Sequence, residues 1–455
     1  MALPMVDFDR FLFAFTVGSH IMLVSVSIAL SILVSVTEFL SIRYSDNYYG
    51  ALSRKLLRVF IISFGVGTAS GVVMAVELVN LFPGFMTLVS QTGVIAVFYD
   101  EVFAFFIETV FLVVYAYYWN SFRGKYTHWL LTLPVVAGTL FSGVLITMVN
   151  AWMNTPNGFN IPGYIATGKV TDVNPWAPFF TVSTLPEIFH VLSMVILTGS
   201  MLVGGYFAYR YVRSKDNDER KMLLKGLRLT TIEAVIFVVL TIYSGINEIT
   251  TLLTEQPLKY AAIELNPSPG SNLPEHLFGN VVGGKVVGGL NVPGLQSFLV
   301  KYETGITSLP GLSQFPQSDW PPLIIHTTFD TMVISGMVLA LFLLIFAVLW
   351  MAGRRPYENM LMSYGLQFFA VFTLMIMELG WMTDELGRQP WIVYNVMTVS
   401  RAANYSEALF VPGLVIIAFY FFLIPFTFYF FSRVFNSKTM DEELRETSFG
   451  GGVNY

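Results

Sequence analysis

The sequence contains no cysteine and few charged residues. Only 12% of its 455 residues are charged, about half of the share found in soluble domains. The absence of cysteine excludes disulfides, zinc–thiolate sites, iron–sulfur clusters and a haem held through a thiolate. A bound metal would therefore need His, Met, carboxylate or other oxygen ligands. The chain has five histidines to offer: His20, His128, His190, His276 and His326.

A basic surface is also missing, because 25 Lys and Arg stand against 30 Asp and Glu. This balance argues against a nucleic-acid partner, whose phosphates bind clustered positive charge. The hydrophobic fraction is 55% and the aromatic fraction is 16%, which suits a chain in contact with lipid. These proportions exclude an ordinary soluble enzyme and a disordered protein.

Long apolar runs predict about nine membrane-spanning helices, since one span needs roughly 20 mostly apolar residues. The expected fold class is therefore an all-α integral membrane protein. The expected spans are residues 11–40, 57–83, 93–119, 127–149, 186–210, 227–253, 321–352, 360–384 and 408–432.

The basic residues predict the orientation of these spans, because cytoplasmic loops are enriched in Lys and Arg. Eighteen basic residues fall in the loops of one side, and seven fall on the other side. The alternation holds across all nine spans and places the N-terminus outside and the C-terminus inside. The seven outer residues are Arg10, Lys169, Lys259, Lys285, Lys301, Arg388 and Arg401.

Spans and loops divide the chain into four parts. Residues 1–253 hold the first six spans, and residues 254–320 form a long outer loop rich in Gly and Pro. Residues 321–435 hold the last three spans, and residues 436–455 form a cytoplasmic tail. A loop of this length without a clear secondary-structure pattern is usually functional or mobile. We expect the end of the tail, Asp441 to Tyr455, to be solvated.

Carboxylates dominate the charges inside the predicted spans, where each charge costs about 2.5–3.5 kcal/mol on insertion scales. Glu101 and Glu108 are seven residues apart, as are Glu378 and Glu385, so each pair shares one helix face. Such pairs suit a proton relay or a metal ligand. For Glu108, this interpretation and a structural one both stay open.

Other interpretations of these acids exist. For Glu38 and Glu77 we favour helix capping or pairing with polar neighbours near the interface. A proton-coupled transporter would also place acids at mid-membrane, but it needs broken helices at matching positions in two repeats. The sequence shows no internal repeat, and nine spans do not divide into halves.

Three histidines, His20, His190 and His326, lie in the outer halves of predicted spans, and Met332 shares a span with His326. A buried His or Met is often ordinary packing. Haem iron, however, takes His or His and Met as axial ligands, and the ring can lie between the helices of a bundle. The residues alone leave these alternatives open.

Several motifs resemble a known family. The most specific is the run Glu385-Leu386-Gly387-Arg388-Gln389-Pro390-Trp391, preceded by Glu378-Leu379-Gly380-Trp381. Further matches are Phe105-Phe106-Ile107-Glu108, Asn150-Ala151-Trp152-Met153-Asn154-Thr155-Pro156 and Lys259-Tyr260-Ala261-Ala262-Ile263-Glu264. From about residue 8 to 395 the chain resembles subunit I of cytochrome bd, a membrane quinol:oxygen oxidoreductase, in its branch with a short quinol loop.

This resemblance implies a set of cofactor ligands. His190 and Met332 would hold a low-spin b-type haem, and His20 and Glu385 would each hold a high-spin haem. Which of these two haems is haem d, or whether both are haem b, stays open. Three further residues would take part in cofactor binding: Glu378, Trp381 and Arg388.

The resemblance also implies the reaction. Lys259 and Glu264 would act in quinol oxidation at the outer face. O2 would be reduced to water at a high-spin haem, with protons taken from the cytoplasm through Glu108 and without pumping. The expected partners are the second subunit of cytochrome bd, with which the chain forms a heterodimer in the cell membrane, and a small single-span subunit.

Two departures from the family pattern stand out. The acidic residue eight positions before Glu108 is Asp100, and Glu101 lies beside it, so either can fill the proton-path role. A family Arg two positions before the Met ligand is replaced by Asp330. Negative charge disfavours the electron-rich reduced haem, so we expect a lowered potential at the low-spin haem. The quinone preference stays open.

Overall fold

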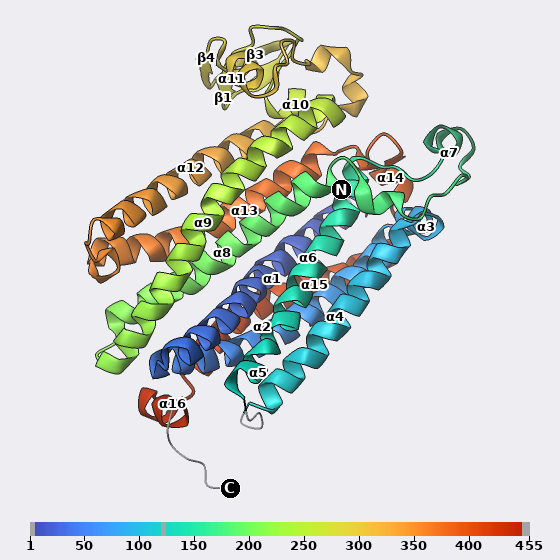
Figure 1. Cartoon of the computed structure of the whole chain (residues 1–455). Helices are drawn as coiled ribbons and strands as arrows, with labels where there is room; N and C mark the ends of the chain where they lie inside the picture. Colours follow the sequence, from blue (N-terminus) through green and yellow to red (C-terminus); the bar gives the residue numbers. More distant parts are fainter. Residues whose placement is uncertain (1–4, 120–123, 448–455) are drawn as a thin grey trace.

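The computed structural model describes residues 5–119 and 124–447 and consists mainly of long antiparallel helices (Figure 1). Nine helices correspond to the nine predicted spans, most of them extended by a few residues at their ends. They are α1 (Met5–Tyr44), α2 (Asn47–Leu81), α4 (Val94–Tyr117), α6 (Thr132–Asn154), α8 (Thr184–Arg213), α9 (Asn217–Glu255), α12 (Ile324–Met351), α13 (Met360–Gly387) and α15 (Phe410–Phe435).

Within the described ranges, eight helices are long and apolar enough to cross a membrane. The helix of the predicted span 93–119, α4, is not among them. Every 18-residue stretch of α4 contains Asp100, Glu101 and Glu108. Its 24 residues extend over about 36 Å, which is enough to cross a hydrocarbon core of about 30 Å.

Short elements complete the chain. The short helices are α3 (Pro83–Gln91), α5 (Lys125–Leu130), α7 (Ile161–Thr167), α10 (Pro257–Ile263), α11 (Leu295–Thr304), α14 (Val399–Ala402) and α16 (Met440–Thr447). The 3-10 turns are η1 (Ala177–Phe180), η2 (Leu312–Gln314), η3 (Gln317–Asp319), η4 (Pro356–Glu358) and η5 (Glu407–Leu409). The strands are β1 (Glu275–Leu277), β2 (Asn280–Val282), β3 (Lys285–Val287), β4 (Leu290–Val292), β5 (Trp391–Val393) and β6 (Met397–Thr398).

Capped turns join the long helices into hairpins. Asp46 begins α2 and accepts hydrogen bonds from the backbone N–H groups of Tyr48 and Tyr49. Asp216 and Asn359 cap α9 and α13 in the same way. Side-chain caps satisfy amide groups that the first helical turn leaves without partners. The short links make α1–α2 and α8–α9 antiparallel neighbours.

Four helices form a closed bundle. α8 packs against α9 and α13, and α12 also packs against α9 and α13 (Figure 1). α8 and α12 therefore lie on opposite corners. A second group contains α1, α2, α4, α6 and α15, and α1 joins the two groups by packing along α8.

The long outer loop is folded, although its sequence shows no clear secondary-structure pattern. β1 pairs with β4, and β2 pairs with β3, so two nested hairpins form between residues 275 and 292. Gly289 has a φ of 72°, and a Cβ atom there would lie 2.3 Å from the carbonyl oxygen of Phe278. Glycine is thus required where the outer hairpin turns back.

The charged residues Asp441, Glu442, Arg445 and Glu446 of α16 are exposed, as expected for a solvated tail, but the expectation is wrong for Glu443. Glu443 on this helix is fully buried, and its carboxylate pairs with Arg58 and lies 3.9 Å from Lys55 Nζ, both on α2. Arg54 Nη1 and Glu446 Oε2 are 2.9 Å apart. These contacts attach the tail to the start of α2. Residues 448–455 of the predicted tail lie outside the described ranges.

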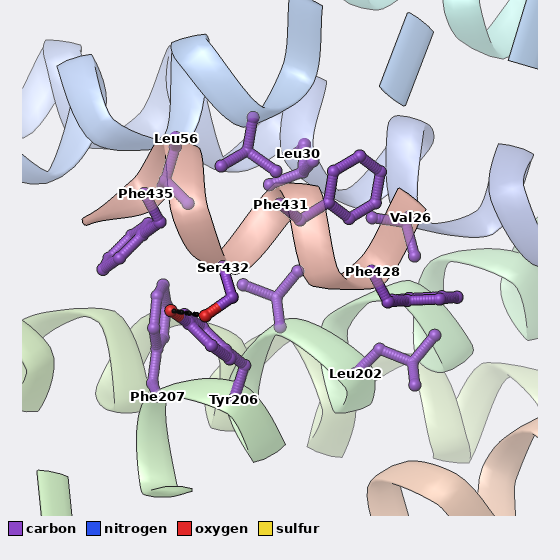
Figure 2. Close-up of a pocket in the computed structure, with 12 residues that line it drawn as sticks. Val26, Leu30, Leu56, Leu202, Tyr206, Phe207, Phe428, Phe431, Ser432 and Phe435 are labelled. Carbon is purple, nitrogen blue, oxygen red and sulfur yellow. Dashed lines mark hydrogen bonds between the residues drawn. The ribbon is translucent and has the colours of Figure 1, made fainter. Parts of the chain in front are cut away.

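A small apolar cavity of about 90 Å³ lies between α1, α2, α8 and α15 (Figure 2). Leucine, valine and phenylalanine side chains form most of its lining. One polar contact joins Tyr206 Oη to Ser432 Oγ at 3.3 Å. No histidine, methionine or carboxylate is among its described lining residues, so this cavity offers no ligand to a metal.

Candidate haem and quinol sites

His20 on α1 is oriented by Ser70 on α2. The distance from His20 Nδ1 to Ser70 Oγ is 2.8 Å, and Ser70 Oγ donates its own proton to the carbonyl oxygen of Gly67 at 2.8 Å. Ser70 Oγ must therefore accept from His20 Nδ1–H. This tautomer leaves the Nε2 lone pair free for a metal, as in metal-binding histidines generally. A Cβ at Gly71 would lie 3.2 Å from His20 Cε1, so Gly71 gives the ring room.

His190 on α8 repeats the arrangement with Ser244 on α9. His190 Nδ1 lies 3.0 Å from Ser244 Oγ, and that hydroxyl donates to the carbonyl oxygen of Thr241 at 3.0 Å. A Cβ at Gly245 would lie 3.3 Å from His190 Cε1. Both helix hairpins thus present a histidine with its Nε2 free, next to a Ser-Gly pair. Sequence reasoning missed these serines, although Ser-Gly occurs on the helix that follows each histidine.

Met332 lies on α12, across the four-helix bundle from α8. A Cβ at Gly380 of α13 would lie 3.2 Å from Met332 Sδ, so this glycine admits the thioether. Met332 and Trp381 are both partly buried and pack against the main core. A His on one corner of a bundle and a Met on the opposite corner fit the two axial positions of a low-spin haem.

Glu385 sits near the end of α13 and is held by Arg388. Arg388 Nη2 donates to Glu385 Oε2 at 2.6 Å, while Arg388 Nη1 donates to Asn150 Oδ1 at 2.8 Å and Asn154 Oδ1 at 2.9 Å. The Arg388 side chain is 1% exposed and the Glu385 side chain 44% exposed. The carboxylate is therefore oriented by a buried cation and remains accessible to a ligand.

Glu378 lies two turns before Glu385 and faces α1. Its Oε2 is 2.6 Å from the place where Gly18 would carry a Cβ, and Gly18 lies two residues before His20. Glu378 Oε1 is buried without a hydrogen-bond partner, as is Trp391 Nε1 of the GRQPW run. Orphaned buried polar atoms beside predicted ligands fit a site built for an additional polar group. No cluster of three or more His, Asp or Glu that could hold a metal ion occurs in the described part.

Lys259 has a partner that sequence reasoning missed. Its Nζ is 2.5 Å from Asp384 Oδ1, and Asp384 Oδ2 accepts from Asn150 at 2.7 Å. The Lys259 stem lies against Gly387, where a Cβ would come within 2.6 Å of Lys259 Cε. Lys259 is only 2% exposed, so it is not a solvated loop charge. Asp384 directly precedes Glu385, and the sequence alone gives no signal that it would face Lys259.

Glu264 ends α10 and is also buried. Burial, with the negative charges of Glu275 and Asp330 nearby, raises the pKa of the Glu264 carboxyl well above its usual value. Burial and the nearby Asp330 raise the pKa of Glu275 to about 7. The outer loop thus brings together two carboxyl groups with raised pKa values, Glu264 and Glu275, next to Asp330 of α12.

Asp330 and His326 tie α12 to this loop. Asp330 Oδ2 accepts from the backbone N–H of Phe278 at 2.5 Å and lies 3.3 Å from His326 Nε2. His326 Nδ1 lies 2.6 Å from the carbonyl oxygen of Ile263, which directly precedes Glu264. Both ring nitrogens of His326 therefore face protein oxygens.

The structure distinguishes the three acids of α4 by the direction in which they face. Glu101 Oε1 accepts from Ser142 at 2.9 Å, and Glu108 Oε1 accepts from Thr139 at 2.5 Å, so both face α6. Asp100 is exposed on another face of α4. Of the two candidates beside each other, Glu101 is the one aligned with Glu108.

Comparison with known proteins gives consistent matches. The family profile described as cytochrome bd terminal oxidase subunit I matches residues 8–439. A Bacillus subtilis (strain 168) protein whose name is that of a cytochrome bd menaquinol oxidase subunit I is 30% identical over 445 residues, covering 96% of this chain and 97% of that protein. The cytochrome bd ubiquinol oxidase subunit 1 of the same strain is 24% identical, with 87% and 85% covered.

A solved structure agrees with the sequence matches. The bd oxidase of Geobacillus thermodenitrificans matches with a TM-score of 0.87 and 28% identity, covering 96% of this chain and 99% of that one. These matches exclude the transporter alternative. The chain belongs to the cytochrome bd terminal oxidase subunit I family, and it is a multi-pass subunit of a quinol oxidase in the cytoplasmic membrane.

Proposed function

We propose that this subunit oxidises quinol at the outer loop and reduces O2 to water with protons taken from the cytoplasm, and that its side chains would hold three haems that supply the electron-transfer chemistry. The observation that carries the proposal is the polar chain Lys259–Asp384–Arg388–Glu385, which joins the predicted quinol residue to a predicted haem ligand through the buried Lys259 and Arg388. Electron donor and acceptor sites would then share one polar network.

The outer loop supplies the groups for quinol oxidation. Quinol gives up two electrons and two protons, and the protons need acceptors that open to the outside. Glu264 is buried next to Glu275, and both carboxyls have raised pKa values, with that of Glu275 raised to about 7, which suits groups that accept the protons of quinol. Lys259 is held by Asp384 and would orient the head group or stabilise its anion.

The helix bundles supply the ligands. His190 and Met332 would hold a low-spin b-type haem, which would supply electron-transfer chemistry. His20 and Glu385 would each hold a high-spin haem, which would supply the chemistry of O2 reduction. The third haem is haem d or a further haem b. Arg388, Glu378 and Trp381 would hold the cofactors in place.

The contact between α4 and α6 supplies groups for a proton path from the cytoplasm. Glu108 and Glu101 face the hydroxyls of Thr139 and Ser142, which supports a proton path along the contact of α4 and α6. Asp100 is exposed on another face of α4 and would serve only as an alternative to Glu101. Protons leave outside and enter inside, so charge separation needs no pump.

Assembly follows from the family. We propose a heterodimer with the second subunit of cytochrome bd, and a small single-span subunit beside it. Residues 1–253 and 321–435 would form the haem-binding bundles and residues 254–320 the quinol loop. The N-terminus would lie outside and the tail from 436 in the cytoplasm.

The first test is spectroscopic and uses the purified complex of both subunits. A dithionite-reduced minus oxidised spectrum with haem extraction should show low-spin b bands and either a red-shifted chlorin band or further haem b. His190→Ala should lose the low-spin bands, whereas His276→Ala, a loop histidine, should keep them. Retention in His190→Ala would remove His190 as a ligand.

A second test separates the two half-reactions. Glu264→Ala should slow the reduction of the haems by quinol under anaerobic conditions and leave O2 binding to the dithionite-reduced protein intact. If O2 binding is impaired first, the assignment of the loop is wrong. A preparation that folds without any haem would overturn the ligand assignments altogether.

A further inference from the structure

Three titratable side chains form a buried, hydrogen-bonded group at the inner end of the bundle. Glu38 on α1, Tyr115 on α4 and His128 on α5 are each less than 10% exposed, and we name them the inner triad. Glu38 Oε1 lies 2.6 Å from His128 Nδ1, and Tyr115 Oη donates to Glu38 Oε2 at 2.5 Å. The ring of His128 stacks on that of Tyr115, with centroids 4.5 Å apart. The proposed function uses none of the three.

The hydrogen bonds of His128 identify one transferable proton. His128 Nε2 lies 3.0 Å from the carbonyl oxygen of Tyr115, which only accepts, so Nε2 carries a hydrogen. At Nδ1 the partner is a carboxyl oxygen. Either Nδ1–H donates to a carboxylate, or a carboxyl O–H donates to Nδ1. A single proton thus lies between His128 and Glu38, and moving it breaks no other hydrogen bond of the triad.

The inner triad is in register with the proposed proton path. Glu101, Glu108 and Tyr115 follow one another at seven-residue intervals, so all three lie on one face of α4. Each interval corresponds to about 10.5 Å along the helix, a distance that a proton crosses through hydroxyls and water. Between the triad and Glu108, Ser35 Oγ of α1 and Thr132 Oγ1 of α6 lie 2.7 Å apart. Ser35 is one helical turn from Glu38, and Thr132 is two turns from Thr139, the partner of Glu108.

Charged and aromatic groups cover the triad on the inner side. Arg54 of α2 lies 5.1 Å from the ring of Trp119, and that ring meets the ring of His128 edge-on at 4.7 Å. Ser53 and Arg54 are the α2 groups that face Tyr115.

We propose that the inner triad is the proton-loading station of oxygen reduction. The proton held between His128 Nδ1 and Glu38 moves through the Ser35–Thr132 hydroxyls and water to the Glu108 carboxylate. The pair then regains a proton from the cytoplasm. Four such transfers accompany each O2, and no electron moves at the triad. The proposal rests on the proposed function, because it needs Glu108 to deliver protons to a haem site.

A purely structural clamp would show the same contacts, so the test needs a variant that keeps the contacts and removes the proton. His128→Gln retains donor and acceptor groups but has no titratable site. Glu38→Gln makes the same change at the other partner. Trp129→Phe is the matched control, because it removes a buried hydrogen bond to the carbonyl oxygen of Ser35 and no titratable group.

The measurements use the haem-loaded complex in detergent and count turnover per haem. We expect both Gln variants to keep the haem spectrum and the anaerobic reduction by quinol, while O2 consumption falls tenfold or more. Trp129→Phe should stay within twofold of the unmodified protein. His128→Gly should be slow and should regain at least fivefold on adding imidazole, a proton carrier that fits the vacated space.

Two outcomes would overturn the proposal. One is O2 consumption above half of the normal rate in His128→Gln and Glu38→Gln. The other, which applies even if the Gln variants assemble poorly, is no response of His128→Gly to imidazole in the haem-containing fraction. Measuring Glu108→Gln in parallel distinguishes a failure of the inner-triad proposal from a failure of the proposed proton path. If Glu108→Gln is slow and His128→Gln is normal, only the triad is wrong, whereas normal turnover in both removes the proton path itself.

Discussion

Ser70 and Ser244 illustrate how one hydroxyl can set the tautomer of a proposed metal ligand. Each gives its proton to a backbone carbonyl of its own helix and must therefore accept from a histidine Nδ1. A neutral histidine with Nδ1 protonated binds metal only through Nε2. The two helix hairpins arrive at this result independently, which supports a common role for His20 and His190.

The first prediction concerns Ser70→Ala. The change leaves the buried Nδ1–H of His20 without its acceptor, which costs about 1–3 kcal/mol, and loss of such an outer partner typically lowers metal affinity about 10–100-fold. We expect a reduced haem-to-protein ratio and a weakened CO difference spectrum of the high-spin haem. Ser70→Thr keeps the hydroxyl and should be much milder. Full haem content with an unchanged CO spectrum in Ser70→Ala would contradict the role.

The second prediction concerns Asp330, which lies two residues before Met332. Asp330→Asn removes a negative charge and keeps an oxygen to accept from Phe278 N–H. A unit charge at about 10 Å and an effective dielectric constant of about 20 corresponds to roughly 1.7 kcal/mol. The low-spin haem potential should therefore rise by about 70 mV in a redox titration. Asp330→Glu is the control, and a lowered or unchanged potential in Asp330→Asn would refute the electrostatic argument.

The candidate ligands and loop residues could be named from the sequence, whereas their partners could not. Motif resemblance identifies Lys259 because it begins the run from Lys259 to Glu264, and the same resemblance implies His190 and Met332 as haem ligands. Asp384 and Ser70 depend on which faces of distant helices meet, and hydropathy does not report this. Asp384 in particular lies next to Glu385 in sequence yet faces Lys259, 125 residues away.

At the scale of elements, hydropathy predicts the spans well because lipid demands about 20 apolar residues in each. α4 shows the limit of this rule, since its three acids lower its apolar character while its length remains sufficient. The outer loop shows another limit. Its hairpins depend on backbone pairing and on glycines such as Gly289, and these leave little trace in a window of hydropathy.

The tail shows why charge patterns can mislead. Asp441, Glu442 and Glu443 read as a solvated acidic start, yet Glu443 is buried against Arg58. A buried carboxylate requires a partner, and the basic residues at the start of α2 supply it. Those residues are nearly 400 positions away, so no local pattern predicts the contact.

The third prediction uses the pH dependence of the outer loop. A carboxyl must be ionised to accept a quinol proton, and the pKa of Glu275 is raised to about 7. Quinol oxidation should therefore increase as the pH rises through this value. Because the charge of Glu275 also raises the pKa of Glu264, Glu275→Gln should lower that pKa and move the rising limb to lower pH.

The measurement is the rate of anaerobic haem reduction by quinol as a function of pH. Glu303→Gln is the matched control, since Glu303 is an exposed acid on α11 of the same loop. Its profile should coincide with that of the unmodified protein. A rising limb that stays in place in Glu275→Gln would show that the two carboxyls do not act together.

At the scale of the whole molecule, the groups proposed for proton release and proton uptake belong to different parts of the fold. Glu264, Glu275 and Asp330 lie close together where the outer loop meets α12. Glu38 lies on α1, whereas Glu101 and Glu108 lie on α4 and face α6. A pump would need groups that exchange protons with both sides in turn. This separation instead suits release outside from quinol and uptake inside for water formation.

The fourth prediction follows from this separation. In sealed vesicles holding the complex, an O2 pulse given to quinol-reduced enzyme should release about one proton per electron on the outer side, because quinol supplies the two in equal number. A dye for external pH and an electrode for O2 measure the ratio, and an uncoupler provides the baseline. His128→Gln should slow the release without altering this ratio, since slower loading on the inner side cannot change the stoichiometry of quinol. A ratio approaching two would require a pumped proton in addition to the quinol proton, and the uptake groups would then have to exchange with the outer side as well.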